Sequence, residues 1–339
     1  MTRIETSTRR ARGPYFEELS RGQVFTQAPS VTLTSGLAAV HQAILGNRLR
    51  VALDQRLAAD LTGEEGALAS PGLVWDVAIG QSTVVTQNVR ANLFYRGLVF
   101  SRYPRLGDTL TTTTTVEALR QNRRREGRPP TGLAVLRIST VDQEGRTVLD
   151  FWRCAMLPLG DPDVETGHAD DLDRVGEEAS DEALARAVAG WRLDRLRHRV
   201  PHAHAFEELR VGDRWEVAGG DVVTSAPELA RLTGNVAAVH HDARAAGGRR
   251  LVYGGHTIGV AFTQLTRALP DLVTIAGWHA CDHVGPVHEG DTLRSTVEVE
   301  RLQPLDGGGG LVHLRVRVTA DDGDDDRPVL DWRPVGVMA

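Results

Sequence analysis

The sequence predicts an α+β protein built from two copies of one unit, each a long helix wrapped by a curved antiparallel sheet. Two observations support this fold class. Short motifs from the first half of the 339-residue chain return in the same order in the second half. In each half, an apolar segment with helical spacing comes before several segments in which β-branched and polar residues alternate, the pattern of half-buried strands.

Three pairs of motifs define the internal repeat. They are separated by 190, 183 and 180 residues, and such similar separations indicate one duplicated unit. The pairs are "YFEELSRGQ" (15–23) with "AFEELRVGD" (205–213), "RLGDTL" (105–110) with "HEGDTL" (288–293), and "VLDFWR" (148–153) with "VLDWR" (329–333). We therefore predict an N-terminal domain over residues 13–160 and a C-terminal domain over residues 201–339.

The segment 161–200 joins the two copies. The acidic stretch "GDPDVETGHADDLDRVGEEASDE" is interrupted by proline and glycine, which is typical of a linker. The following stretch, "EALARAVAGWRLDRL", has helical spacing and predicts a connecting helix.

Each copy shows the same order of elements. A short helix comes first; in the second copy, Ser225 and Glu228 predict a capping box at its start and Gly234 its end. Long apolar helices are expected over 74–85 and 256–269. Strands are expected over 108–120, 132–142, 291–302 and 310–320.

Composition excludes several classes of protein. With 39 basic and 45 acidic residues the net charge is −6, which argues against a nucleic-acid surface. No apolar run approaches the roughly 20 residues of a membrane span, and residues 1–13 lack the apolar core of a secretory signal. Cys154 and Cys281 supply neither a disulfide framework nor a paired metal-ligand spacing. We expect a cytoplasmic protein that binds neither nucleic acid nor a membrane.

The stretch "TGNVAAVHHD" at 233–242 carries a family resemblance, together with "LVYGGHTIGVA" and "VGPVHEGDTL". It resembles the MaoC-like, R-specific enoyl-CoA hydratases, which have a hot-dog fold. With "ANLFYRG" and "GDTLTTTTTVEALRQN", most of the chain is similar to the mesaconyl-CoA hydratases, also called β-methylmalyl-CoA dehydratases. The resemblance implies a tandem, or double, hot-dog fold, and a homodimer of such chains is one assembly that it allows.

The resemblance implies a site in the second copy. His240 is the candidate proton carrier, because histidine titrates near neutrality and can both accept and donate a proton. Asn235 stands where the wider family has a catalytic Asp, and it can position a water molecule but cannot take its proton. Backbone N–H groups after Gly254 and Gly255 suit a developing oxyanion. We expect His256 and His283 to be further substrate contacts.

The first copy lacks the imidazole. Aligning the copies places Ala52 opposite His240, although Gly46, Asn47 and Asp54 stand opposite Gly234, Asn235 and Asp242. A duplicated hydratase is expected to keep one working site per chain. We therefore predict that the N-terminal site is degenerate and that its half forms a wall for the CoA arm.

Structural interpretations of the same residues stay open. His240 can be a hydrogen-bonded histidine in a loop, and the glycine pair a tight turn. His241 and Asp242 are typical of a polar turn, although Asp242 can also orient an imidazole. His279, Cys281 and His283 have no fixed metal-ligand motif, so no metal is expected. A carboxylate or CoA phosphate needs a cation; the candidates are Arg249 and Arg250, and also Arg48, Arg90 and Arg96.

The predicted activity is that of a hydro-lyase: reversible hydration of an α,β-unsaturated acyl-CoA, mesaconyl-CoA (2-methylfumaryl-CoA), to β-methylmalyl-CoA. No cofactor is expected, since the CoA thioester is the substrate. Three alternatives remain: a general R-specific enoyl-CoA hydratase or hydroxyacyl dehydratase, a non-catalytic acyl-thioester binder, and a hot-dog thioesterase.

Overall fold

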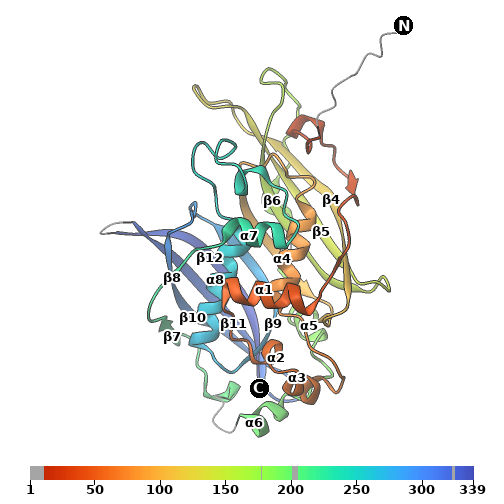
Figure 1. The fold of residues 1–339 in the computed structure, drawn as a ribbon, viewed down its shortest axis with the longest axis vertical. Helices are drawn as coiled ribbons and strands as arrows, with labels where there is room; N and C mark the ends of the chain where they lie inside the picture. Colours follow the sequence, from red (N-terminus) through yellow and green to blue (C-terminus); the bar gives the residue numbers. More distant parts are fainter. Residues whose placement is uncertain (1–10, 177, 201–204, 323–324) are drawn as a thin grey trace.

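The computed structural model describes residues 11–176, 178–200, 205–322 and 325–339. These residues form a twelve-stranded antiparallel sheet flanked by two long central helices (Figure 1). The strand order is β1-β4-β5-β6-β3-β9-β12-β11-β10-β7, with β2 pairing β4 and β8 pairing β10. The strand order of one half is therefore the mirror image of the strand order of the other, and the two halves meet at the β3–β9 pair.

The N-terminal half contributes eleven of the described elements. Its helices are η1 (Phe16–Glu18), α1 (Ser35–Leu45), α2 (Arg50–Leu53), α3 (Gln55–Thr62) and α4 (Pro71–Ser82). Its strands are β1 (Val24–Phe25), β2 (Val31–Thr32), β3 (Ala91–Phe100), β4 (Thr109–Gln121), β5 (Thr131–Val141) and β6 (Thr147–Pro158).

The C-terminal half repeats this order. Its helices are η3 (Phe206–Glu208), α7 (Ala226–Leu232), η4 (Ala238–His240) and α8 (Gly254–Ala268). Its strands are β7 (Arg214–Glu216), β8 (Asp221–Val222), β9 (Leu272–His283), β10 (Thr292–Pro304), β11 (Gly310–Asp322) and β12 (Asp325–Met338). The elements η2 (Leu172–Arg174), α5 (Asp181–Arg186) and α6 (Asp194–Arg199) lie between the halves.

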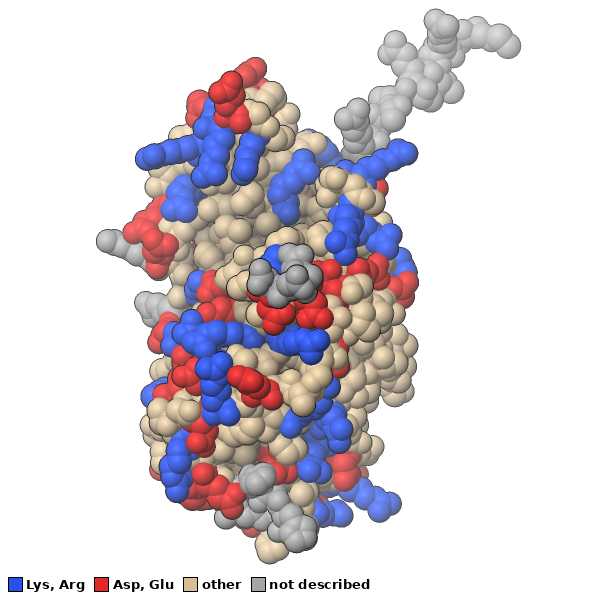
Figure 2. Space-filling view, turned by 90° about the vertical axis from the view of Figure 1, so that its left-hand side faces the viewer, with Lys and Arg blue, Asp and Glu red and all other residues tan. Residues whose placement is uncertain are grey.

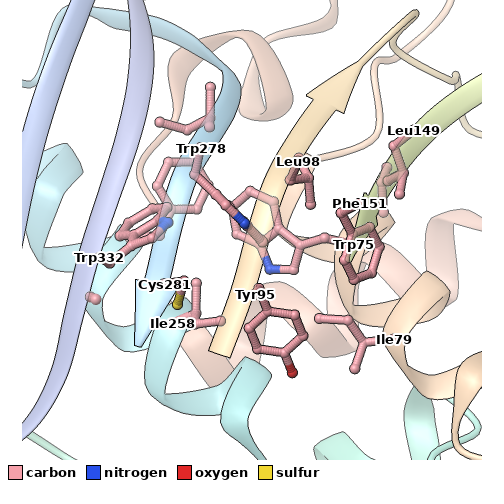
Figure 3. Packing of buried hydrophobic residues seen from close by; sticks show 14 of the residues in the cluster. Trp75, Ile79, Tyr95, Leu98, Leu149, Phe151, Ile258, Trp278, Cys281 and Trp332 are labelled. Carbon is pink, nitrogen blue, oxygen red and sulfur yellow. The ribbon is translucent and has the colours of Figure 1, made fainter. Parts of the chain in front are cut away.

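The core is built around the two central helices. All residues of α4 are buried, because the helix packs against β4 and β5 on one side and contacts α8 on another. Trp75 of α4 lies within 6.2 Å, between ring centroids, of both Trp278 of β9 and Trp332 of β12 (Figure 3). These aromatic contacts cross from one half to the other. Burying rings of this size contributes several kcal/mol in total, so the two halves share one core.

Most of the expected elements are confirmed. The double hot-dog architecture is present, and the long helices and the four strands predicted from alternation correspond to α4, α8, β4, β5, β10 and β11. The domain boundaries stay predictions. Residues 201–204, where the second domain was expected to begin, lie outside the described residues, as do 1–10 of the N-terminal segment.

Two local expectations are wrong. Ser225 does not cap α7: its φ is 58°, a left-handed conformation, and its side chain makes no capping hydrogen bond. The backbone N–H of Ala226 instead donates, at 3.1 Å, to the carboxylate of Glu289, which lies in a turn distant in the sequence. The single connecting helix is two short helices, α5 and α6, because the chain turns between them at Gly190.

The described surface mixes both signs of charge. Basic and acidic side chains are interspersed over the face shown in Figure 2. Among the helices that the structure describes, none combines the length and the apolar character needed to cross a membrane.

Candidate active site

A cavity of about 290 Å³ lies between the two halves of the protein. The N-terminal half contributes side chains from the end of α4 and from β3 and β6, including Tyr95 and Arg153. The C-terminal half contributes the stretch 235–240, the start of α8 and the end of β9. The size suits an acyl group with only part of a larger ligand inside.

The loop that leads to His240 is held by the other half of the molecule. The backbone N–H of Val236 donates to the Thr83 hydroxyl at 2.9 Å, and that of Ala238 donates to the Gln87 carbonyl at 2.9 Å. Gly80 of α4 lies so close to the Thr233 carbonyl that any side chain at Gly80 would collide with it. The two halves must therefore dock correctly for this loop to take its shape.

His240 lies at the end of η4 and lines the cavity. Its Nδ1 lies 2.8 Å from the carbonyl oxygen of Leu251. A carbonyl can only accept, so Nδ1 carries the proton and Nε2 is the basic nitrogen. Burial lowers the pKa of His240 to about 4, and the hydrogen bond to Leu251 opposes this only in part. The imidazole is therefore neutral at neutral pH and can act as a base.

Asn235 is buried and lines the same cavity. Its side-chain oxygen accepts a hydrogen bond from the backbone N–H of Ala237 at 2.9 Å, which identifies the oxygen and leaves the amide nitrogen to face other partners. Asn47 forms the same turn in the first copy, accepting from Leu49 at 2.8 Å. The amide nitrogen of Asn235 can thus donate a hydrogen bond to a ligand in the cavity, whereas its side-chain oxygen already accepts one from Ala237.

His241 and Asp242 support the loop. The Nε2 of His241 donates to the backbone carbonyl of Asn235 at 2.7 Å, and Asp242 accepts from the backbone N–H of Arg244 at 2.9 Å. Asp54, the counterpart of Asp242, accepts from Arg56 at 2.9 Å in the same way. Asp242 therefore does not orient an imidazole; the Leu251 carbonyl orients His240.

The start of α8 reaches the cavity through Gly254. The first N–H groups of a helix have no partner within the helix and suit an anionic oxygen. His283 also lines the cavity, and its Nε2 would lie 2.8 Å from a side-chain carbon at Gly254. Glycine is therefore needed there for the imidazole to pack. Burial and, to a smaller extent, the charge of Arg153 lower the pKa of His283 to about 4.

Gly255 and His256 turn away from the cavity. A side chain at Gly255 would collide with the carboxylate of Asp76 on α4, so this glycine serves the contact between the central helices. His256 is 1% exposed and does not line the cavity; burial lowers its pKa to about 4.

A buried carboxylate, that of Asp76, holds one residue of the cavity wall in place. Asp76 accepts from His41 at 3.0 Å and from the Tyr253 hydroxyl at 3.3 Å, and burial raises the pKa of Asp76. The Tyr253 ring lines the cavity and lies 5.8 Å from the His240 ring between centroids. This arrangement fixes an aromatic wall beside the imidazole. Its members come from both halves, so no single motif indicated them.

Comparison with known proteins places these features in a family. No protein-family profile matches the chain. A conserved hypothetical protein from Mycobacterium tuberculosis, described as having a double hot-dog fold, is 52% identical, with 96% of this chain and 99% of that chain covered and a TM-score of 0.89. A structure of a MaoC domain protein dehydratase from Chloroflexus aurantiacus is 26% identical, with 98% and 99% covered and a TM-score of 0.84. The chain belongs to the same double hot-dog family as the Mycobacterium tuberculosis protein.

Two curated relatives are named for their reactions. The β-methylmalyl-CoA dehydratase of Chloroflexus aurantiacus is 28% identical over 333 residues, 94% of this chain and 90% of its own. The mesaconyl-CoA hydratase of Cereibacter sphaeroides is 26% identical over 310 residues, 90% and 88% of the two chains. Both relatives align along nearly the full double hot-dog unit.

In this double hot-dog protein, most of the predicted arginine contacts lie away from the cavity. Arg249 pairs with Asp291 at 3.2 Å, Arg250 with Glu289 at 2.8 Å and Arg96 with Asp282 at 2.6 Å. Arg90 lines the cavity but is exposed. The sequence prediction missed Arg153, which is 3% exposed and lines the cavity. A usable signal was present, since Arg153 shares strand parity with the apolar Phe151.

The residues considered for a metal do not converge. His279 contacts His313 at 2.9 Å, Cys281 lies in the core, and His283 lines the cavity. Within the described ranges, no cluster of three or more His, Cys, Asp or Glu residues is arranged to hold a metal ion. A reaction without a metal stays a prediction.

Proposed function

We propose that this protein is a hydro-lyase that reversibly adds water to the double bond of an α,β-unsaturated acyl-CoA. The main support for this proposal is the geometry of His240. Its imidazole lines the cavity, its Nδ1–H donates to the Leu251 carbonyl, and its Nε2 is left as the basic nitrogen. Hydration needs such a neutral base beside the substrate.

In this addition, the His240 imidazole acts first as a base and then as an acid. His240 removes a proton from water through Nε2, and the oxygen forms a bond to the β-carbon as the electron pair of the double bond moves toward the thioester. The imidazolium then delivers the proton to the α-carbon. Asn235 can donate from its amide to the attacking water, since its oxygen is held by Ala237.

Charge develops on the thioester oxygen during this step. The first N–H groups of α8, which have no partner within the helix, are suited to stabilise it, because Gly254 at the start of the helix lines the cavity. Donors of this kind are typically worth about 100- to 1000-fold in turnover each.

We further propose that the substrate is mesaconyl-CoA and that β-methylmalyl-CoA is the hydrated product. The relatives from Chloroflexus aurantiacus and Cereibacter sphaeroides, which are named for these compounds, support it. A general enoyl-CoA hydratase acting on a neutral acyl chain is the alternative within the same class.

The experiment is a panel of enoyl-CoA esters, including mesaconyl-CoA and crotonyl-CoA, incubated with the purified protein. Hydration removes the absorbance of the conjugated thioester, and the expected result is such a loss, with hydroxyacyl-CoA as product. An unchanged absorbance for every ester, with an acyl-CoA bound in calorimetry, would instead support a non-catalytic binder. Release of free CoA thiol would indicate a thioesterase.

A further inference from the structure

The wall of the cavity is cationic. It contains the side chains of Arg90 and Arg153, and none of the described residues that line it is Asp or Glu. A cavity with this lining favours an anionic ligand over a neutral one, because the low dielectric of the surrounding protein strengthens the field of the buried charge.

Arg153 is the buried source of that charge. It extends from β6, is 3% exposed, and donates to three neutral oxygens: Asn92 at 3.2 Å, Ser82 at 2.7 Å and Thr86 at 3.1 Å. A guanidinium has five N–H donors, so one remains on each terminal nitrogen. No carboxylate of the described residues lies within ion-pair distance of Arg153. A buried cation without a counter-ion is costly unless a ligand supplies one.

A comparison of β6 with its duplicate, β12, shows that an arginine facing the cavity is specific to the first copy. Arg153 ends "VLDFWR", and Arg333 ends the shorter "VLDWR". The missing residue reverses the parity of the second arginine, so Arg333 faces outward and pairs with Glu300 at 2.9 Å. The inward arginine therefore occurs only in the strand that walls the cavity of His240.

The chemistry of a dicarboxylic enoyl-CoA requires a cation at such a place. In mesaconyl-CoA the free carboxylate is bonded to the β-carbon, the atom that receives the hydroxyl group. The group that binds this carboxylate must therefore lie in the same cavity as the base. Arg153 meets this condition, whereas Arg96, Arg249 and Arg250 lie outside the cavity and already pair with carboxylates.

We propose that Arg153 binds the free carboxylate of a dicarboxylic enoyl-CoA and so selects it over neutral acyl chains; this inference rests on the hydratase function proposed above. The two remaining N–H donors of Arg153 give a charge-assisted contact to the carboxylate. Ser82, Thr86 and Asn92 hold the guanidinium in place before the substrate arrives.

The test compares two substrates that differ only in the carboxylate: mesaconyl-CoA and 2-methylcrotonyl-CoA, in which a methyl group replaces it. The readout is the ratio of their kcat/KM values. We expect the unaltered protein to favour mesaconyl-CoA, and Arg153→Met to lower the ratio by about 30- to 1000-fold, the range for removing one partner of a buried charge pair. Arg153→Lys, which keeps the charge without the fork, should lose part of the ratio.

Arg96→Met is the matched control, because it removes a strand arginine that pairs with Asp282 outside the cavity; its ratio should stay within about threefold of the unaltered value. If Arg153→Met does not fold, the ratio is measured for Arg153→Lys, and for the unaltered protein with mesaconyl-CoA against its methyl ester.

Four outcomes would overturn the inference. Equal kcat/KM values for both substrates in the unaltered protein, or a ratio unchanged in both Arg153 variants, would refute carboxylate binding while leaving the hydratase proposal standing. A ratio lost in Arg90→Met but kept in Arg153→Met would move the subsite to the exposed arginine. Hydration of neither substrate would refute the hydratase proposal, and this inference with it.

Discussion

Replacing His240 by alanine separates a catalytic role from a structural one. In the fold the side chain makes one hydrogen bond, from Nδ1 to the Leu251 carbonyl at 2.8 Å. Losing one such bond and some packing costs about 1–3 kcal/mol, and ordinary domains have about 5–15 kcal/mol of stability. The variant should therefore remain folded at 25 °C, with a melting temperature a few degrees lower.

The expected loss of turnover is much larger. Without its proton carrier the enzyme should slow by about 100- to 10,000-fold, which corresponds to roughly 3–5 kcal/mol of transition-state stabilisation. Turnover of mesaconyl-CoA and thermal unfolding are measured on the same preparation, and the affinity for a saturated acyl-CoA should change little.

His288→Ala is the matched control. Its Nδ1 also donates to a backbone carbonyl at 2.8 Å, that of Arg250, but the side chain does not line the cavity. This variant should lose similar stability and keep turnover within a few-fold. A folded His240→Ala protein with near-normal turnover would refute the catalytic role of His240 and direct attention to His283.

Three further predictions concern the same site. Because burial lowers the pKa of His240 from 6.5 to about 4, its base form persists as the pH falls to about 5, so kcat/KM should stay level from pH 7 to 5 and then fall; an acidic limb at pH 6.5 would contradict this. Asn235→Ala should cost less than His240→Ala, because positioning a water is easier to replace than moving a proton, and Asn235→Asp should retain activity; equal losses in both Asn235 variants and His240→Ala would refute this division of roles. Since Ala52 replaces the imidazole in the first copy, calorimetric titration with a saturated acyl-CoA should give one site per chain, and two equivalent sites would refute the degenerate first site.

The repeated elements were predictable because their signals are local. Alternation along 291–302 and 310–320 predicts β10 and β11, and the apolar run after Gly255 predicts α8. The capping box at Ser225 failed because a distant residue, Glu289, caps the helix instead. A motif of four residues contains no information about such a partner.

The site was predictable in part for the same reason. His240 and Asn235 lie in one short motif, so the sequence places them together, and the cavity includes both. The role of the Asn235 oxygen follows only from the turn to Ala237. Arg153 comes from the other half of the chain, 82 residues before Asn235, and reaches the cavity through the docking of two domains. Strand parity indicates that Arg153 faces inward, but the identity of its neighbours requires the three-dimensional structure.

The hydratase activity is tested most directly by following mesaconyl-CoA with the purified protein in water enriched in oxygen-18. We predict loss of the enoyl absorbance and a product in which one oxygen-18 atom is bonded to the β-carbon, at a rate that falls by at least about a hundredfold in His240→Ala. An unchanged absorbance, or label found only in a carboxylate released from CoA, would contradict it.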